Sequence, residues 1–319
     1  MGTAPTIITV TGEIAASELG QTLAHEHLWC DISVQSQKPD NVLQDVALMT
    51  NELRSFLEVD GRTVIEVTPE DLGRNPGKLR ELSLASGVQI VSGIAFYDES
   101  LYPPWVREAN VGTIADYFVR HVEEGVAGVR AGLIGEVASH NETDPNPLAY
   151  RLRPLETKVF QAAAQAQQTT GVAISTHASL GRAGHAQLDV LEAAGANLKK
   201  VAVGHCDAHC HSDAERDFEY YLPILERGAF CQFDLIGWEE LAPDPIRALR
   251  IAALLELGYE RQILLSTDTC RLSQLHTHGG RGFDYLWNRF LPRLLELGVT
   301  KAQVHSMLVE APLALLGRS

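Results

Sequence analysis

Residues 21–27 have the sequence QTLAHEH, an apolar run that ends in two histidines on either side of a glutamate. Successive side chains of a β-strand point to opposite faces, so His25 and His27 are expected on one side and Glu26 on the other. Two imidazoles on the same side of a strand form a candidate clamp for a metal ion. The segment therefore predicts a buried strand with a functional end.

The same form, an apolar or β-branched run with a polar end, recurs seven times along the chain. Near-continuous apolar runs of this kind are typical of strands that are buried on both faces of a parallel sheet. The seven runs are TVIEVTP at 63–69, VQIVSGIAFY at 88–97, AGLIGEVAS at 131–139, GVAISTHAS at 171–179, KVAVGHCD at 200–207, AFCQFDLIG at 229–237 and QILLSTDT at 262–269.

Helical patterns lie between these predicted strands. Apolar residues recur at helical spacing from Val42 to Phe56, and the segment 154–171 starts with Pro154 and ends with Gly171. A third helix is expected to have Asp244 as its N-cap and Pro245 in its first turn. Eight strands that alternate with helices predict a (β/α)₈ TIM barrel, and we expect residues 1–319 to form a single domain. The alternative is a doubly wound open sheet, but no Gly-x-Gly-x-x-Gly motif or P-loop follows any of the strands.

The composition limits the partners of the protein. A net charge of −15 and a pI near 5.2 argue against binding to nucleic acid or to an anionic membrane and favour a small-molecule substrate. Five scattered cysteines do not form an obvious disulfide framework, which favours a reducing compartment. The first residues lack the pattern of a signal peptide, and no apolar run reaches the length of a membrane span. We therefore expect a cytoplasmic protein.

Six potential metal ligands lie at the ends of the predicted strands. Residues at the C-terminal ends of barrel strands converge on one mouth, so side chains that are distant in sequence can share a metal site there. Each residue alone has a simpler interpretation: a histidine hydrogen-bonded within the structure, or a carboxylate that forms an ion pair or caps a helix. Taken together, a His-x-His pair on the first strand followed by a carboxylate, two histidines and an aspartate on later strands favours a metal site. The six residues are His25, His27, Glu136, His177, His205 and Asp268.

The segment 204–211, GHCDAHCH, offers a competing local site because it concentrates cysteine and histidine. Its spacing fits neither a Cys₄ nor a Cys₂His₂ zinc motif. We interpret His205 as a ligand of the shared site and the cysteines and later histidines as loop residues. Asp207 is expected either to orient a ligand histidine or to cap the next helix.

The motifs AHEH, THAS, GHCD and STD, together with the closing segment MLVEAPLALLG, resemble the phosphotriesterase family of the amidohydrolase superfamily nearly from end to end. The resemblance implies that His25 and His27 bind a buried metal ion and that His177 and His205 bind a more exposed one. It also implies that Asp268 completes the first site, faces a bridging water and accepts its proton. Two divalent ions are expected, zinc first, with manganese, cobalt or iron as alternatives.

Position 136 departs from the best-known members of that family, which bridge the two metals with a carboxylated lysine. Glu136 resembles instead the bridging glutamate of the phosphotriesterase homology proteins. Both groups present one negative charge and two oxygen atoms. Glu136 falls one residue later than the usual lysine, so a regular strand would turn it outward. A bulge or an altered strand end near Gly135 is therefore predicted.

The resemblance implies a binuclear hydrolase in which a bridging hydroxide attacks an ester, a lactone or a related acyl or phosphoryl bond. A lactone or carboxylic ester is favoured over a phosphotriester. The alternatives are a mononuclear deaminase-like enzyme, an N-acyl amide hydrolase and a degenerate barrel without activity. Tyr97 and Arg271 are predicted to contact the substrate, Arg271 through its planar fork, with packing and a surface ion pair as the simpler interpretations. Trp238 and the segment 274–286 are expected to line the mouth, and His276 and His278 are not expected to be ligands. Family analogy suggests a homodimer.

Overall fold

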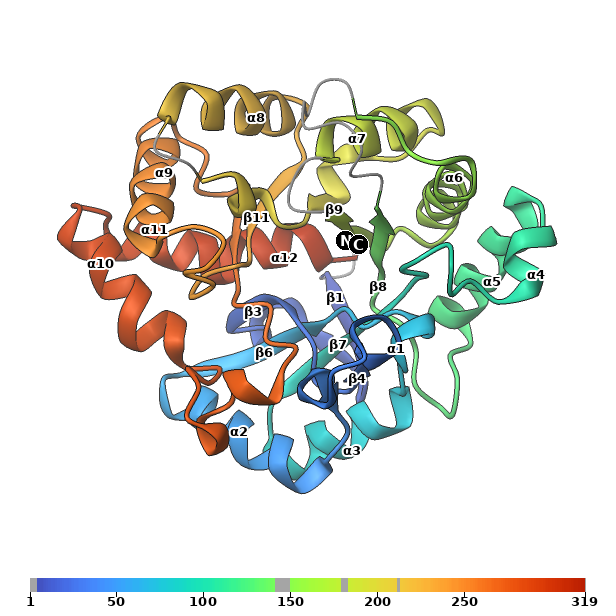
Figure 1. Cartoon of the computed structure of the whole chain (residues 1–319), viewed down its shortest axis with the longest axis horizontal. Helices are drawn as coiled ribbons and strands as arrows, with labels where there is room; N and C mark the ends of the chain where they lie inside the picture. The colour runs from blue at the N-terminus through green and yellow to red at the C-terminus, as the bar shows by residue number, and fades with distance from the viewer. Residues whose placement is uncertain (1–4, 141–149, 179–182, 211–212, 319) are drawn as a thin grey trace.

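The computed structural model describes residues 5–140, 150–178, 183–210 and 213–318. Eight parallel strands follow one another in chain order around a barrel (Figure 1), which confirms the predicted (β/α)₈ fold. All eight predicted strands are present, within a few residues of their expected bounds. They are β3 (Gln21–Glu26), β6 (Gly61–Glu66), β7 (Gln89–Ile94), β8 (Leu133–Ser139), β9 (Ala173–Ala178), β10 (Val201–Val203), β11 (Phe230–Phe233) and β12 (Ile263–Leu265).

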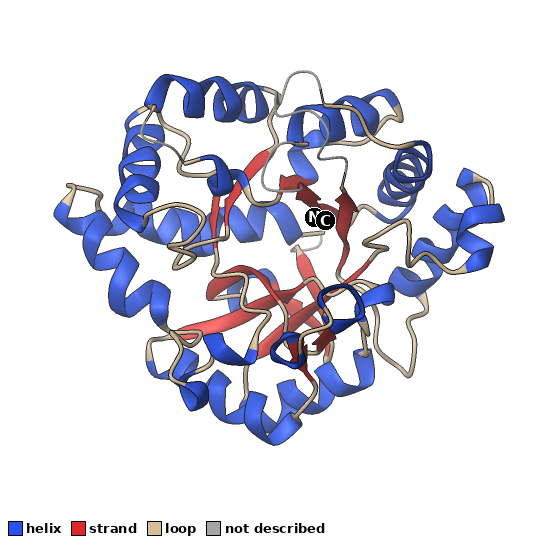
Figure 2. Ribbon diagram, viewed as in Figure 1, coloured by secondary structure: helices blue, strands red, loops and turns tan. Residues whose placement is uncertain are grey.

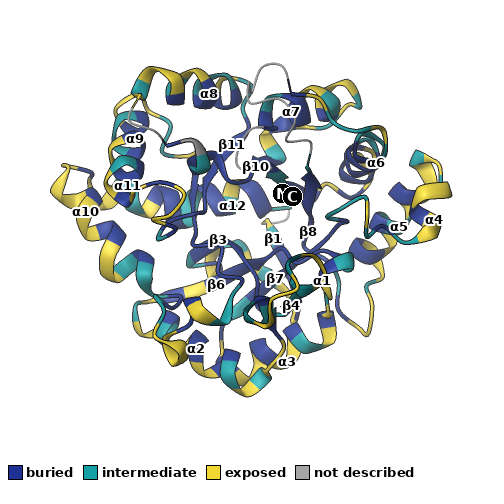
Figure 3. Cartoon of the chain, viewed as in Figure 1, coloured by how far each residue is buried: buried dark blue, intermediate teal, exposed yellow. Residues whose placement is uncertain are grey.

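Helices form the outer ring around the strands (Figure 2). The sides of the helices that face the barrel are buried, and their outer sides are exposed (Figure 3). The helices are α1 (Ser33–Ser36), α2 (Val46–Glu58), α3 (Pro76–Ser86), α4 (Pro104–Glu108), α5 (Val111–Glu123), α6 (Pro154–Thr170), α7 (Gly184–Ala193), α8 (Ala214–Glu226), α9 (Asp244–Glu256), α10 (Leu291–Glu296), α11 (Lys301–His305) and α12 (Ala311–Leu316). In the described part of the chain, no helix combines the length and the apolar character needed to cross a membrane.

The helix ends follow local rules, with two departures from expectation. Helix α6 begins at Pro154, and Gly171 after it adopts a left-handed conformation with φ 71°, as its sequence predicts. Helix α2 begins later than the apolar pattern suggested, because Asp45 caps it by accepting a hydrogen bond from the Leu48 amide. Val42 lies instead in the short strand β5 (Val42–Leu43), which pairs with β4 (Cys30–Asp31). The predicted N-cap Asp244 is already the first residue of α9, and its carboxylate accepts a hydrogen bond from the Gly237 amide.

The end of the barrel at the amino ends of the strands is filled with apolar side chains. Only the opposite end, at the carboxyl ends of the strands, can therefore open to solvent. One residue from each strand contributes to this buried layer: Ala24, Ile65, Val91, Leu133, Ala173, Ala202, Phe230 and Leu264. Helix α12 and the hairpin of β1 (Thr6–Thr9) and β2 (Gly12–Ala15) cover the layer from below. The chain ends meet there, because Thr6 and Arg318 exchange two backbone hydrogen bonds of 2.9 Å.

The barrel closes between β3 and β12 through the side chain of Glu26. This buried carboxylate accepts hydrogen bonds from the amides of Thr267 (2.8 Å) and Thr269 (2.6 Å) and from the Ser266 hydroxyl (2.7 Å). The amide of His25 donates in turn to the Ser266 hydroxyl. Glu26 thus points away from the two histidines beside it, as strand alternation predicts, and joins the first barrel strand to the last.

Candidate metal centre and substrate cavity

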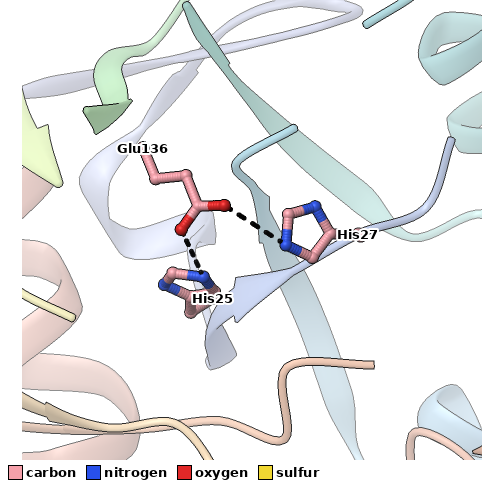
Figure 4. A group of neighbouring side chains, drawn as sticks. All are labelled: His25, His27 and Glu136. Atoms are coloured by element: carbon pink, nitrogen blue, oxygen red, sulfur yellow. Dashed lines mark ion pairs between the residues drawn. The ribbon is translucent and has the colours of Figure 1, made fainter. Parts of the chain in front are cut away.

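The six predicted ligands meet at the carboxyl ends of the strands. His25 and His27 extend from β3, and Glu136 reaches both from β8 (Figure 4). The Nε2 atom of His25 lies 3.1 Å from Oε2 of Glu136, and Nε2 of His27 lies 3.5 Å from Oε1. Asp268, just after β12, places Oδ1 3.3 Å from Nε2 of His27 and 3.8 Å from that of His25.

A second pair of histidines approaches the same glutamate from the other side. His177 at the end of β9 places Nδ1 3.4 Å from Oε2 of Glu136. His205, two residues beyond β10, places Nε2 2.8 Å from that same nitrogen of His177. Two triads of closely spaced ligand atoms therefore share Glu136, one with His25 and His27 and the other with His177 and His205.

The strand irregularity predicted near Gly135 is present and accounts for the direction of Glu136. The pairing register of β8 with β9 shifts between Ile134 and Val137. Such a shift places an extra residue on one strand and reverses the alternation beyond it, so Glu136 can point inward. The peptide bond between Gly135 and Glu136 is cis. A Cβ atom on Gly135 would lie 2.7 Å from the backbone oxygen of Ser175, so this position has no room for a side chain.

The other ring nitrogens of three histidines are held by neighbouring residues. Nδ1 of His27 lies 2.9 Å from the Thr68 hydroxyl, which donates its proton to Glu66 over 2.5 Å and therefore accepts one from His27. Nδ1 of His25 (3.2 Å) and of His205 (2.9 Å) both face the carboxylate of Asp234, the residue after β11. A proton held on Nδ1 leaves the Nε2 lone pairs of all three rings directed to the shared space.

A divalent cation fits this arrangement. Within the described chain, His25 Nε2 and Glu136 Oε2 are buried and form no hydrogen bond, although they lie 3.1 Å apart. Leaving buried polar atoms without a partner costs roughly 1–3 kcal/mol each. Imidazole nitrogens and carboxylate oxygens are the ligands that zinc and similar ions bind in proteins. The two unpartnered atoms and the four nearby histidines therefore suit one or more cations.

Charge in the site is distributed unevenly. Burial lowers the pKa of His205, but the charge of Asp234 and its hydrogen bond outweigh burial and raise that pKa to about 9. Burial lowers the pKa of His177, whose far ring nitrogen faces the Tyr97 hydroxyl and contacts no carboxylate among the described residues. Burial opposes ionisation of Glu136, yet the charge of His25 holds the pKa of its carboxyl well below the usual range. Glu136 therefore stays anionic at neutral pH, as a cation ligand must be.

Two of the ligand positions have unusual backbone conformations. His205 has φ 54° and Asp268 has φ 45°, in the left-handed region that residues with side chains rarely adopt. Both residues lie just past the end of a strand, where the chain turns away from the barrel. Such conformations cost about 1–3 kcal/mol and concentrate at functional sites, which agrees with a role for both residues in the site.

A cavity of about 300 Å³ opens above the cluster, and a deeper one of about 160 Å³ reaches His27 and Glu136. Tyr97 and Arg271, predicted to contact the substrate, line both cavities together with Trp238. The Tyr97 hydroxyl lies 3.3 Å from Nε2 of His177. The upper cavity is lined by Gln35, Tyr97, His140, His177, His205, Leu235, Trp238, Leu241, Asp268 and Arg271.

The Asp207 side chain, expected either to orient a ligand histidine or to cap the next helix, binds an arginine and a backbone amide instead. Its buried carboxylate accepts hydrogen bonds from Arg247 Nε (2.8 Å) and from the Leu235 amide (3.0 Å), and not from a histidine among the described residues. The carboxylate that contacts the histidines is Asp234, 29 residues after His205. Asp207 therefore affects the histidines indirectly, because its hydrogen bond to the Leu235 amide holds the backbone next to Asp234.

The sequence-based prediction missed Asp234 and His140. Asp234 directly follows strand β11, a position like those of the chosen ligands at the ends of their strands, so its position was a usable signal. His140 follows β8 and lines the upper cavity. Its ring stacks on that of His177, with 5.1 Å between the ring centres, and meets the Tyr97 ring edge-on at 4.6 Å. His211, interpreted from the sequence as a loop residue, lies outside the described residues.

A (β/α)₈ barrel whose carboxyl-end mouth holds four histidines around one glutamate defines the class of protein. Residues 5–316 match the model of the phosphotriesterase family, and the chain belongs to this family, which is metal-dependent.

Known proteins resemble the chain over most of its length. Phosphotriesterase homology protein from Escherichia coli is 35% identical over 92% of this chain and 96% of that protein, and its crystal structure, with phosphate in the active site, has a TM-score of 0.85. A lactonase from Listeria monocytogenes is 26% identical over 98% of both chains, with a TM-score of 0.88. N-acetyltaurine hydrolase from Danio rerio is 26% identical over 95% of both chains.

Proposed function

We propose that this protein is a binuclear metal-dependent hydrolase of lactones or carboxylic esters. The observation that carries the proposal is the sharing of Glu136 by two histidine pairs, with unpartnered buried atoms between them. A carboxylate with two oxygen atoms can serve one cation with each oxygen. His25, His27 and Asp268 would hold one ion, and His177 and His205 the other. When bound, the cations would acidify a water to supply the nucleophile and would polarise the scissile bond.

The residues of the chain supply orientation and proton transfer. Asp268 is anionic because the hydrogen bond from His27 and the charge of His205 outweigh burial and lower the pKa of its carboxyl. Its Oδ1 atom lies 3.3 Å from Nε2 of His27 and 3.8 Å from that of His25, where it would accept the proton of the attacking water and pass it to the leaving group. The Tyr97 hydroxyl, beside His177 at the cavity wall, would hydrogen-bond the substrate carbonyl or the leaving oxygen.

The choice of a lactone or ester over a phosphotriester rests on the lactonase among the similar structures and on the volume and apolar lining of the cavity. Its volume of about 300 Å³ lies at the small end of the range for ligand pockets, roughly 300–1,000 Å³. Leu235, Leu241 and Trp238 provide apolar wall area for an acyl chain.

The second candidate is hydrolysis of an N-acyl amide. The alignment with N-acetyltaurine hydrolases of several vertebrates covers 95% of the chain, and the human enzyme is 27% identical. The same arrangement of residues can attack an amide carbonyl, provided that the leaving nitrogen receives a proton. Asp268, after accepting the proton of the water, is positioned to donate it.

The proposal is tested with zinc-loaded protein and a panel of lactones, carboxylic esters, N-acyl amides and phosphotriesters. We expect two metal ions per chain by elemental analysis and the highest kcat/KM for a lactone or ester. His25→Asn and Glu136→Gln should each lower metal content and activity. One ion per fully loaded chain would favour the mononuclear alternative, and unchanged activity in both variants would refute the assigned site.

A further inference from the structure

Arg271 and Trp238 form a preorganised wall of the substrate cavity. The Arg271 guanidinium lies 4.4 Å from the centre of the Trp238 ring. The indole is only 6% exposed, and its Nε1 donates a 2.8 Å hydrogen bond to the backbone oxygen of Thr267, next to Asp268. A second guanidinium, that of Arg281, lies 5.5 Å from the same ring and donates to the same Thr267 oxygen. Trp238 is thus a fixed platform that limits the positions open to Arg271.

The charge of Arg271 is poorly neutralised by the protein. Among the described residues its nearest carboxylate is that of Glu240, 4.0 Å away, and the Glu240 side chain is 62% exposed. An ion pair that long and that exposed contributes little. The Nε atom of Arg271 is buried and has no hydrogen-bond partner within the described chain. The Arg271 side chain as a whole is 39% exposed and lines the cavities, so its guanidinium can donate to an acceptor that the protein itself does not supply.

The location of Arg271 connects it to the reacting centre. It lines both cavities together with Asp268, His177 and His205. Among the described residues that line these cavities, it is the one side chain with a permanent positive charge. The protein as a whole carries −15, a field that repels anions, so an anion that enters here must be attracted locally.

From this geometry we propose that the substrate carries an anionic oxygen group, best matched by a carboxylate, which Arg271 binds against the Trp238 ring. The planar fork of arginine fits the two oxygen atoms of a carboxylate. The anionic group is separate from the scissile bond and unchanged by the reaction: water adds to the acyl carbon, the bond to the leaving oxygen or nitrogen breaks, and the leaving atom takes a proton. This inference rests on the proposed hydrolase function and specifies its substrate class.

The test compares substrates that differ in one charged group. One pair is γ-butyrolactone and γ-carboxy-γ-butyrolactone, and the other is N-acetylglycinamide and N-acetylglycine. For the zinc-loaded protein we expect kcat/KM to favour the carboxylate member of the pair that is hydrolysed. In Arg271→Gln this preference should fall on the order of 10- to 100-fold, the range for a charge-assisted hydrogen bond. The change should appear mainly in KM, because the group binds away from the reacting bond.

Three further variants separate charge, geometry and general effects. Arg271→Lys keeps the charge but lacks the fork, so it should restore only part of the preference. Glu240→Gln removes a competing carboxylate and should raise the preference. Arg62→Gln, at a 49% exposed side chain outside the cavities, is the matched control and should leave the preference unchanged.

A binding measurement keeps this inference independent of turnover. Calorimetry with metal-free protein should detect γ-carboxy-γ-butyrolactone more readily than γ-butyrolactone, and Arg271→Gln should abolish the difference. Absence of hydrolysis for every compound would refute the proposed function. The calorimetric comparison would still decide whether Arg271 forms an anion site. Equal binding of the two lactones, or a preference that survives Arg271→Gln, would overturn the anion site.

Discussion

The histidines of the mouth are supported in two different ways. Between β3 and β6, His27 is held by a neutral hydroxyl, Thr68, which passes the contact on to the buried carboxylate of Glu66. Between β10 and β11, a single carboxylate, Asp234, contacts His25 and His205 directly. The Thr68 hydroxyl thus connects one histidine ring to a buried carboxylate, whereas the Asp234 carboxylate contacts two histidine rings itself.

The difference teaches where the site is most sensitive. A carboxylate in direct contact stabilises a protonated ring far more than a hydroxyl does, which is why the pKa of His205 rises to about 9. Asp234 also depends on its surroundings: Asp207 binds the neighbouring amide of Leu235, and the buried Arg247 binds Asp207. We therefore expect substitutions between β10 and β11 to reduce stability and metal affinity more than substitutions between β3 and β6.

The largest effect is expected from Arg247→Met. Arg247 is fully buried, forms ion pairs with Asp207 (2.8 Å) and Asp244 (3.1 Å) and donates to the backbone oxygen of Trp238. Removing one partner of a buried ion pair costs about 3–5 kcal/mol because the remaining charge is left unpaired. Urea denaturation of the metal-free protein measures the loss. Arg62→Met on the surface should change the free energy of unfolding by less than about 0.5 kcal/mol, and a loss that small for Arg247→Met would contradict the network.

Zinc affinity should rise steeply with pH on the β10–β11 side. In the metal-free protein the pKa of His205 lies at about 9, above its ordinary value of 6.5. Its proton therefore contributes stability that is fully present below pH 6.5 and is lost as the pH rises through about 9. A metal ion must displace that proton, so affinity should increase by up to about tenfold per pH unit between these values. Chelator competition at several pH values measures the slope, and a flat profile would show that His205 is neutral before the metal binds.

Asp234→Asn should weaken zinc binding by about 10- to 100-fold, the usual cost of losing a partner that orients a metal ligand. Two histidines lose their carboxylate, so the upper part of that range is expected. The steep pH dependence should flatten in the same variant. Asp189→Asn, at a side chain that is 70% exposed, is the matched control for chelator competition.

The smallest effect is expected from Thr68→Val. The substitution preserves shape but removes the hydroxyl between His27 and Glu66, at a cost of about 1 kcal/mol. Zinc affinity should therefore fall by about tenfold or less, and the pH profile should keep its slope because Asp234 is intact. If Thr68→Val lost more zinc affinity than Asp234→Asn, the proposed difference between the two regions would be wrong.

Sequence periodicity predicted the barrel well because each strand is buried on both faces and therefore leaves an apolar run such as QILLSTDT. The same strands placed the six candidate ligands, since strand ends share one mouth. The direction of Glu136 required a register shift that is recognisable in sequence only by comparison with an expected alternation. The partner of His205 was harder to predict. Asp207 is its neighbour in sequence, but a 3-10 turn at Cys206–His209 carries Asp207 toward Arg247, while pairing of β10 with β11 brings Asp234 close.

The closure by Glu26 has a consequence for the order in which the protein can mature. Glu26 bonds Thr267, 241 positions later in the chain, and this junction also brings His25 and His27 to Asp268. During synthesis the ribosome adds His25 and His27 more than 240 residues before it adds Asp268. A nascent chain therefore holds an incomplete set of candidate ligands until its last barrel strand has been made, so a metal ion that needs Asp268 could be bound only after that point.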